Sequence, residues 1–105
     1  MRILFDQGTP VPLRRELIGH EVATAFEMGW SELSNGELLR AAEGSFDLLI
    51  TTILRHQQNL AGRRLRILVL TTTSWPRIRP HAARVAAAAA ALRPGELREL
   101  EVPTT

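Results

Sequence analysis

Short apolar runs alternate with polar, helix-compatible segments along the chain. Continuous or nearly continuous apolar runs, which are typical of strands buried on both faces of a parallel sheet, occur at residues 3–5, within residues 46–52 and at residues 65–70. Residues 20–25 alternate loosely between apolar and polar side chains, and residues 97–102 alternate apolar with charged ones. These two patterns predict a second strand and an edge strand.

The segment between the first two strands predicts a short helix over residues 10–18. Thr9 is its candidate cap, and Pro10 fits the first helical position, where the N–H has no partner in any case. The expected apolar face consists of Leu13, Leu17 and Ile18.

Two further helices are predicted with their caps. Ser34 and Glu37 have the spacing of a capping box, in which each residue satisfies a backbone N–H of the other. Residues 75–92 predict a last helix, with Ser74 as its cap and a Pro-Gly pair after it. Residues 55–60 are polar and helix-compatible. Strands and helices thus alternate, and we expect a small three-layer α/β sandwich around a mostly parallel sheet, in one domain of 105 residues.

Asp6 directly follows the first strand, and glycine and proline residues then end regular structure. Ligands of open α/β sheets gather beyond the carboxyl ends of strands, so Asp6 is a candidate first acid of a metal site. The alternative is an aspartate that caps the next helix or closes the turn. Glu37 is the second candidate acid, although it competes with its own role in the capping box. Hydrolysis by Mg²⁺ or Mn²⁺ requires several such carboxylates to hold the metal and activate water.

The net charge of +2 conceals an uneven distribution of charge, and all thirteen basic residues are arginines. Residues 1–52 carry four arginines and eight acids, residues 53–95 carry eight arginines and no acid, and the remainder carries one arginine and three acids. Arginine favours bidentate contacts with phosphate or carboxylate, so the basic segment suits nucleic acid or an acidic partner. A solvated arginine-rich surface is the alternative.

Two absences narrow the functional classes. The chain has no cysteine, which excludes disulfides, thiolate metal sites and cysteine nucleophiles. Its longest apolar block, residues 85–92, is far shorter than the roughly 20 residues of a membrane span. We therefore expect a cytoplasmic protein that does not enter a membrane.

Several strings taken together resemble a bacterial PIN-like family, described as nucleases of predicted toxin–antitoxin systems. The resemblance extends from Met1 to about Glu101 and rests on MRILFDQ, GHEV, LSNGELLRAAE, FDLLITT, RHQQNLAGR and SWPRIRPH, in the expected order. It implies a PIN-like fold and an ancestry among Mg²⁺- or Mn²⁺-dependent ribonucleases. Asp6 matches the acid of the family's first strand, and Glu37 matches the acid that follows SNG.

The sequence departs from this family at one position of chemical importance. Family members continue from the two threonines into a third acid, in a Thr-Thr-Asp-x-Asn pattern, whereas Thr52 is followed here by Ile53. Three explanations stay open: loop residues missing from the sequence, a deletion that weakens catalysis, or replacement by another group. Asp47 is a poor replacement because it lies at the amino end of its strand.

Three hypotheses about function follow. The leading one is a metal-dependent ribonuclease with Asp6 and Glu37 as catalytic metal ligands. Its candidate substrate contacts are Thr52, Arg55, Gln57, Arg63, Arg64, Thr72 and Ser74. The alternative is an inactive module of the same fold that binds RNA or an antitoxin protein through its basic segment. A third hypothesis is a homodimer that pairs through the edge strand at residues 97–102.

Overall fold

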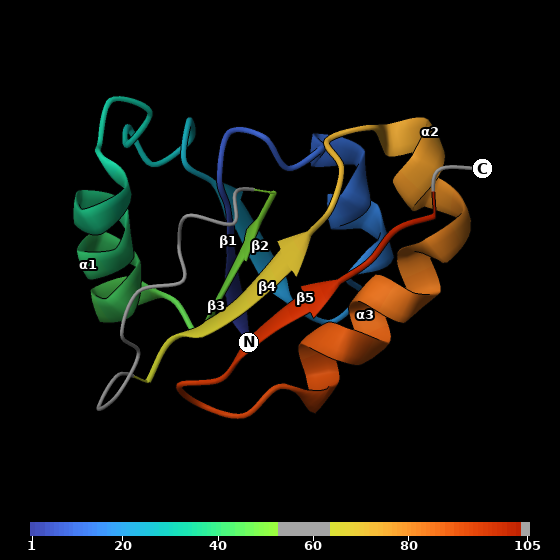
Figure 1. Cartoon of the computed structure of the whole chain (residues 1–105). Helices are drawn as coiled ribbons and strands as arrows, with labels where there is room; N and C mark the ends of the chain where they lie inside the picture. The colour runs from blue at the N-terminus through green and yellow to red at the C-terminus, as the bar shows by residue number, and fades with distance from the viewer. Residues whose placement is uncertain (53–63, 104–105) are drawn as a thin grey trace.

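A sheet of five strands lies at the centre of the computed structural model, which describes residues 1–52 and 64–103 (Figure 1). Every neighbouring pair of strands is parallel, and their order is β2-β1-β3-β4-β5. The strands are β1 (Arg2–Phe5), β2 (Glu21–Thr24), β3 (Leu48–Thr51), β4 (Arg66–Leu70) and β5 (Leu97–Leu100). The five predicted strands are thus confirmed, in a sheet that is parallel throughout.

The hydrophobic pattern determines which strands lie in the middle of the sheet. β1, β3 and β4 come from the continuous apolar runs, and nearly all of their side chains are buried. β2 and β5 come from the alternating segments, lie at the two edges and keep several side chains partly exposed. Strands buried on both faces require helices above and below them, which the chain supplies.

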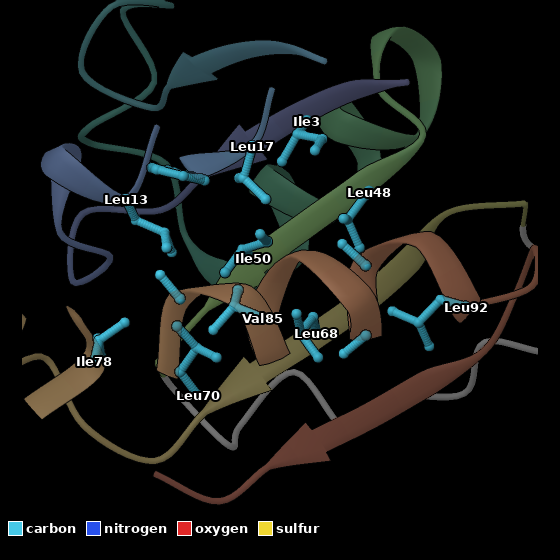
Figure 2. Packing of buried hydrophobic residues seen from close by; sticks show 14 of the residues in the cluster. Ile3, Leu13, Leu17, Leu48, Ile50, Leu68, Leu70, Ile78, Val85 and Leu92 are labelled. Carbon is cyan, nitrogen blue, oxygen red and sulfur yellow. The ribbon is translucent and has the colours of Figure 1, made fainter. Parts of the chain in front are cut away.

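Two separate hydrophobic cores divide the molecule into three layers. On one face of the sheet, α1 (Asn35–Ser45) packs on alternate side chains such as Leu4, Leu49 and Val69. On the other face, η1 (Val11–Glu16), α2 (Trp75–Ile78) and α3 (Ala82–Ala91) pack on the intervening ones (Figure 2). The three-layer α/β sandwich predicted from the sequence is confirmed at this level.

The prediction of a single helix over residues 75–92 is wrong. The segment is divided into α2, a 3-10 turn η3 (Arg79–His81) and α3. Pro80 accounts for the break, because it lacks the N–H that a continuous helix uses and its ring crowds the carbonyl four residues earlier. Ser74 occupies the N-cap position of α2, as predicted, but its side chain makes no capping hydrogen bond. Its backbone N–H instead donates to Oγ1 of Thr72 at 3.1 Å.

The helix predicted over residues 10–18 is the shorter 3-10 helix η1. Thr9 does not cap it, because the following proline occupies the cap position and the Thr9 side chain is turned toward Asp6. The two leucines of the predicted face are buried, whereas Ile18 is 88% exposed. Between Ile18 and β2, Gly19 adopts a φ of +86°, as expected of a glycine that ends a helix.

The path of the chain places a topological switch point between β1 and β3. The chain leaves β1 for β2 on one side, crosses back by way of α1, and enters β3 on the other side of β1. The connections from β1 to β2 and from β4 to β5 cross the same face of the sheet but lead toward opposite edges, so these crossovers have opposite hands.

Within residues 1–52 and 64–103, no helix has the length and apolar character needed to cross a membrane.

Candidate functional site

Polar groups gather at the carboxyl edge of the sheet, around the switch point. Asp6 follows β1 there, and Thr24 and Thr51 end the two flanking strands. All three are buried, and together with Thr9 they make up the buried polar residues of the described part of the chain. In sheets of this kind, the crevice beside the switch point is the usual place for a ligand.

The carboxylate of Asp6 is fixed in place by hydrogen bonds. It is 4% exposed, and Oδ1 accepts from the N–H of Gly8 at 3.2 Å and lies 3.0 Å from the hydroxyl of Thr9. Oδ2 accepts from the hydroxyl of Thr51. The Thr9 hydroxyl also lies 2.9 Å from the carbonyl oxygen of Ile50, so its one proton is shared between two acceptors. Asp6 therefore closes its turn and at the same time holds a charge at the strand ends.

Gly8 brings the loop after β1 close to the end of β3. A Cβ atom at this position would lie 2.3 Å from Oγ1 of Thr52, which is far inside van der Waals contact. The loop can therefore cover this side of Asp6 only because residue 8 has no side chain. Thr52, predicted as a substrate contact, thus lies next to the Asp6 turn.

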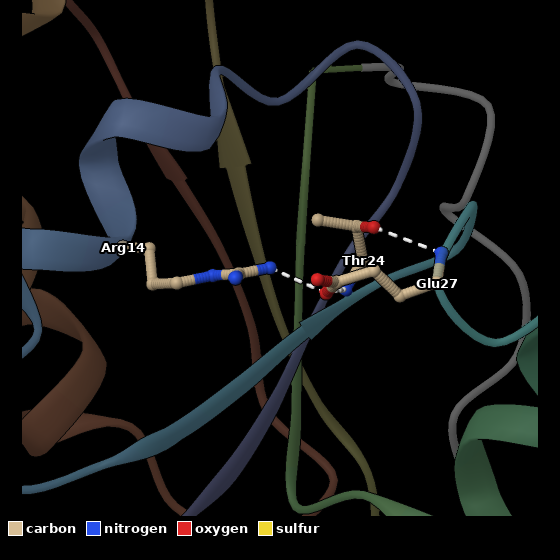
Figure 3. Close-up of polar contacts among 3 residues, drawn as sticks. All are labelled: Arg14, Thr24 and Glu27. Atoms are coloured by element: carbon tan, nitrogen blue, oxygen red, sulfur yellow. Dashed lines mark hydrogen bonds and ion pairs between the residues drawn. The ribbon is translucent and has the colours of Figure 1, made fainter.

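A second polar cluster lies between β2 and η1 (Figure 3). Oε1 of Glu27 accepts from the N–H of Thr24 at 2.9 Å, and Oγ1 of Thr24 accepts from the N–H of Glu27 at 3.0 Å. Arg14, on η1, donates to the same Glu27 oxygen and forms an ion pair with it. The hydrogen bond from Arg14, followed by that from the Thr24 backbone, holds the pKa of Glu27 below its ordinary value of 4.5. The turn after β2 is therefore tied to η1 by a charged group.

Glu37 forms the predicted capping box with Ser34. Its Oε1 accepts from the Ser34 N–H at 2.9 Å, and its own N–H donates to Oγ of Ser34 at 3.3 Å. The backbone N–H of Ser34 holds the pKa of Glu37 below its ordinary value of 4.5. From α1, the residues that share a small depression with Asp6 are Asn35 and Leu38. The side chain of Glu37 is exposed at the start of the helix and is engaged there.

The described residues do not make up a metal centre with three acids. In residues 1–52 and 64–103, no group of three or more histidine or acidic side chains is placed to hold a metal ion. Mg²⁺ and Mn²⁺ need several oxygen ligands, whereas this edge offers one buried carboxylate that already accepts hydrogen bonds. The acids present therefore do not fit the metal that the family resemblance implies.

The other predicted site residues lie at different ends of the sheet. Thr72 and Ser74 follow β4 at the carboxyl edge, as Asp6 follows β1. Arg64 precedes β4 and lies at the amino edge, where its N–H donates to Oε1 of Glu43 at 2.7 Å. Asp47 is also at the amino edge, as predicted, and its Oδ2 accepts from the Arg2 N–H at 2.8 Å. Arg55, Gln57 and Arg63, the helix expected over residues 55–60 and the junction after Thr52 lie outside the described residues.

Exposed arginines lie on the helices that follow β4. Arg77, Arg79 and Arg84 are all exposed, and none of them forms an ion pair with another described residue. Because α2 begins a few residues after the end of β4, it lies at the carboxyl edge of the sheet (Figure 1). The carboxyl edge therefore has a buried carboxylate at β1, and the helices after β4 carry arginines that form no ion pair with the described residues.

Sequence reasoning missed several residues of this edge. Thr24 and Glu27 have the same threonine-x-x-glutamate spacing as a capping box, a signal that was available. Thr9 and Arg14 carried no comparable signal, because their partners are distant in sequence. Comparisons of the chain with models of protein families, with curated proteins and with solved structures find no match.

Proposed function

We propose that this chain is a PIN-like protein that binds single-stranded RNA along the carboxyl edge of its sheet. The observation that carries the proposal is the set of exposed arginines, Arg77, Arg79 and Arg84, without ion-pair partners among the described residues. Unpaired guanidinium groups are available for phosphate, to which arginine binds in bidentate geometry. The PIN-like resemblance of the sequence supports RNA as the polyanion.

The charge of the chain supports the same conclusion. Residues 53–95 hold eight arginines and no acid, so this part of the chain cannot neutralise its own charge. Positive potential of this kind raises the rate at which a polyanion arrives and makes binding sensitive to salt. The topology brings the helix that follows β4 to the same edge of the sheet as Asp6.

Hydrolysis of RNA by a Mg²⁺- or Mn²⁺-dependent reaction is the second candidate function. The specific observation in its favour is that Asp6 occupies the switch point as a buried carboxylate fixed by hydrogen bonds. Against it stand the engagement of Glu37 in the cap of α1 and the absence of a three-acid group among residues 1–52 and 64–103. Binding without cleavage is therefore the function that the described geometry supports best.

The proposal extends to partners and location. An antitoxin protein with an acidic surface would meet the same arginines, and a second copy of the chain would pair through the outer edge of β5. A protein that binds cellular RNA in this way would act in the cytoplasm. These statements rest on the PIN-like resemblance and on the charge pattern.

Fluorescence anisotropy with a labelled single-stranded RNA, measured between 50 and 200 mM salt, tests the proposal. We expect salt-sensitive binding, and we expect the triple variant Arg77→Gln, Arg79→Gln, Arg84→Gln to lower the salt slope by about 2, at roughly 0.7 per lost phosphate contact. The matched control is Arg98→Gln on β5, because Arg98 already faces Glu96 at 3.8 Å. Absence of binding, or an unchanged slope in the triple variant, would contradict RNA binding at this surface.

The same preparation separates binding from hydrolysis. Incubation with Mn²⁺ and RNA, followed by gel analysis, compares the wild-type chain with Asp6→Asn. RNA binding by the wild type, without cleavage by either protein, agrees with the binding function. Cleavage by the wild type that Asp6→Asn removes would establish the ribonuclease instead.

A further inference from the structure

We propose that Phe26 is the stacking platform for one base of the bound RNA, in a depression that has Asp6 in its wall. The inference rests on the proposed RNA binding and adds to it the subsite that would engage a base. The basic helices supply contacts to phosphate, which carry no preference for a base. A surface that binds single strands also needs flat apolar groups on which bases can stack.

Phe26 differs from the other aromatic residues of the chain in its exposure. Its side chain is 80% exposed, whereas Phe5 and Phe46 are buried and both tryptophans are partly buried. An exposed phenylalanine gains nothing from the hydrophobic core, so the fold does not require it. It is available to a ligand.

The turn that carries Phe26 is fixed before any ligand binds. The N–H of Gly29 donates to the carbonyl of Phe26 at 3.0 Å, and the N–H of Trp30 donates to the carbonyl of Ala25 at 2.8 Å. The next residue, Glu27, is bonded to Thr24 and paired with Arg14 (Figure 3). A platform held in this way loses little conformational freedom when a base stacks on it.

The depression beside Phe26 has the size and chemistry for a base. Its volume is about 540 Å³, and Phe26 and Val11, which is 53% exposed, supply its apolar surface. Gln7, Arg14 and Glu27 line it with polar side chains of the kinds that bond the donors and acceptors on the edge of a base. Its buried lining consists of Asp6, Thr9 and Thr24, whose side chains are hydrogen-bonded within the fold. Ligand sites in proteins commonly enclose about 300–1,000 Å³ and combine apolar walls with a few polar groups.

RNA fits this depression better than a protein partner does. A stable protein interface buries roughly 800 Å² on each side around an apolar centre, whereas among residues 1–52 and 64–103 the large exposed apolar residues that line this depression are Val11 and Phe26. A base offers an apolar face and a polar edge on the scale of a single side chain. The arginine-bearing helices that follow β4 would hold the phosphates of the same strand.

Equilibrium binding of two probes tests the assignment: a labelled single-stranded RNA, and inorganic polyphosphate, which has no bases and serves as competitor. We expect Phe26→Ala to weaken RNA binding by about 5- to 150-fold, the range found when a stacking aromatic is truncated. Polyphosphate should bind the variant as it binds the wild type. Phe26→Trp should bind RNA at least as tightly as the wild type. The control is Ile18→Ala, which removes another apolar side chain, 88% exposed, and should change neither probe.

Each other outcome has a definite meaning. Wild-type RNA binding that Phe26→Ala leaves unchanged overturns the base subsite and leaves the proposed function standing. An equal loss of affinity for RNA and for polyphosphate also overturns the base subsite, because the effect of the substitution would then not depend on bases. A wild type that binds no RNA removes the proposed function and this subsite with it. If Phe26→Ala changes only the sedimentation of the protein, the depression is a contact between copies of the chain.

Discussion

The hydroxyl of Thr51 donates to the carboxylate of Asp6, which joins the ends of two neighbouring strands whose residues are 45 apart in sequence. Both side chains are buried, so neither can exchange this bond freely for one to bulk water. The contact therefore couples the charged group of the candidate site to the stability of the sheet.

Replacing Thr51 with valine should destabilise the fold. The shape is nearly kept but the donor is lost, and removing one partner from a buried polar pair costs about 1–3 kcal/mol. Unfolding in urea, followed by circular dichroism, measures the change. The control Thr73→Val alters an exposed threonine and should stay within about 0.5 kcal/mol of the wild type. Equal effects of the two substitutions would mean that the Thr51–Asp6 bond contributes no stability.

Gly8→Ala should also destabilise the fold, and a second substitution should restore part of the lost stability. The new Cβ would lie 2.3 Å from Oγ1 of Thr52, a contact with a short side chain that has little room to move. Overpacking of this kind costs about 1–3 kcal/mol. With Thr52→Ala the closest remaining Thr52 atom would be Cβ at 3.7 Å, so the double variant should be more stable than Gly8→Ala alone. Additive losses in thermal melts would contradict the clash.

Glu37 can be tested separately as a helix cap and as a metal ligand. Glutamine also serves at the third position of a capping box, so the free energy of unfolding of Glu37→Gln should be close to that of the wild type. Ser34→Ala removes the other half of the box and should cost about 0.5–2 kcal/mol. We expect Glu37→Gln to leave RNA binding unchanged. Mn²⁺-dependent cleavage that this folded variant loses would instead assign Glu37 a role in the reaction.

The ion pair of Glu27 and Arg14 predicts a dependence of stability on pH. A carboxyl whose pKa is lowered by folding stabilises the fold above its unfolded value of 4.5, and this stabilisation is lost as the pH falls through the folded value. Glu27→Gln should therefore be less stable than the wild type at pH 7, and the difference should shrink below about pH 4.5. Melting temperatures measured from pH 7 to pH 3 provide the check. A difference that stays constant over this range would exclude the charge as its cause.

The fold could be predicted further from the sequence than the site could. Burial on both faces leaves a continuous apolar run, which located β1, β3 and β4 directly. The sequence contains no comparable signal for the order of the strands, because strand order depends on which faces the helices cover. The break at Pro80 was predictable from the chemistry of proline. The long alanine run that follows it favours helix so strongly that the break was missed.

At the candidate site, local patterns were informative and distant contacts were not. The box of Ser34 and Glu37 depends on four consecutive residues and was predicted correctly. Thr9 contacts groups on β3, and Arg14 contacts the turn after β2, so neither role has a local pattern. The exposure of Phe26 also depends on tertiary structure, since the residues next to it in sequence do not indicate that it lies outside the core.

The position of β1 between β2 and β3 has a consequence for the order in which the protein is made. Asp6 is synthesised before its partner Thr51, which follows 45 residues later. At a synthesis rate of about 5–20 residues per second, roughly 2–9 s pass between the addition of Asp6 and the addition of Thr51, whose hydroxyl bonds its carboxylate. Nascent chains that stop before β3 cannot assemble this edge of the sheet. The growing polypeptide therefore carries its candidate acid while β2 and α1 are synthesised, and it acquires the complete carboxylate environment only once β3 has been made.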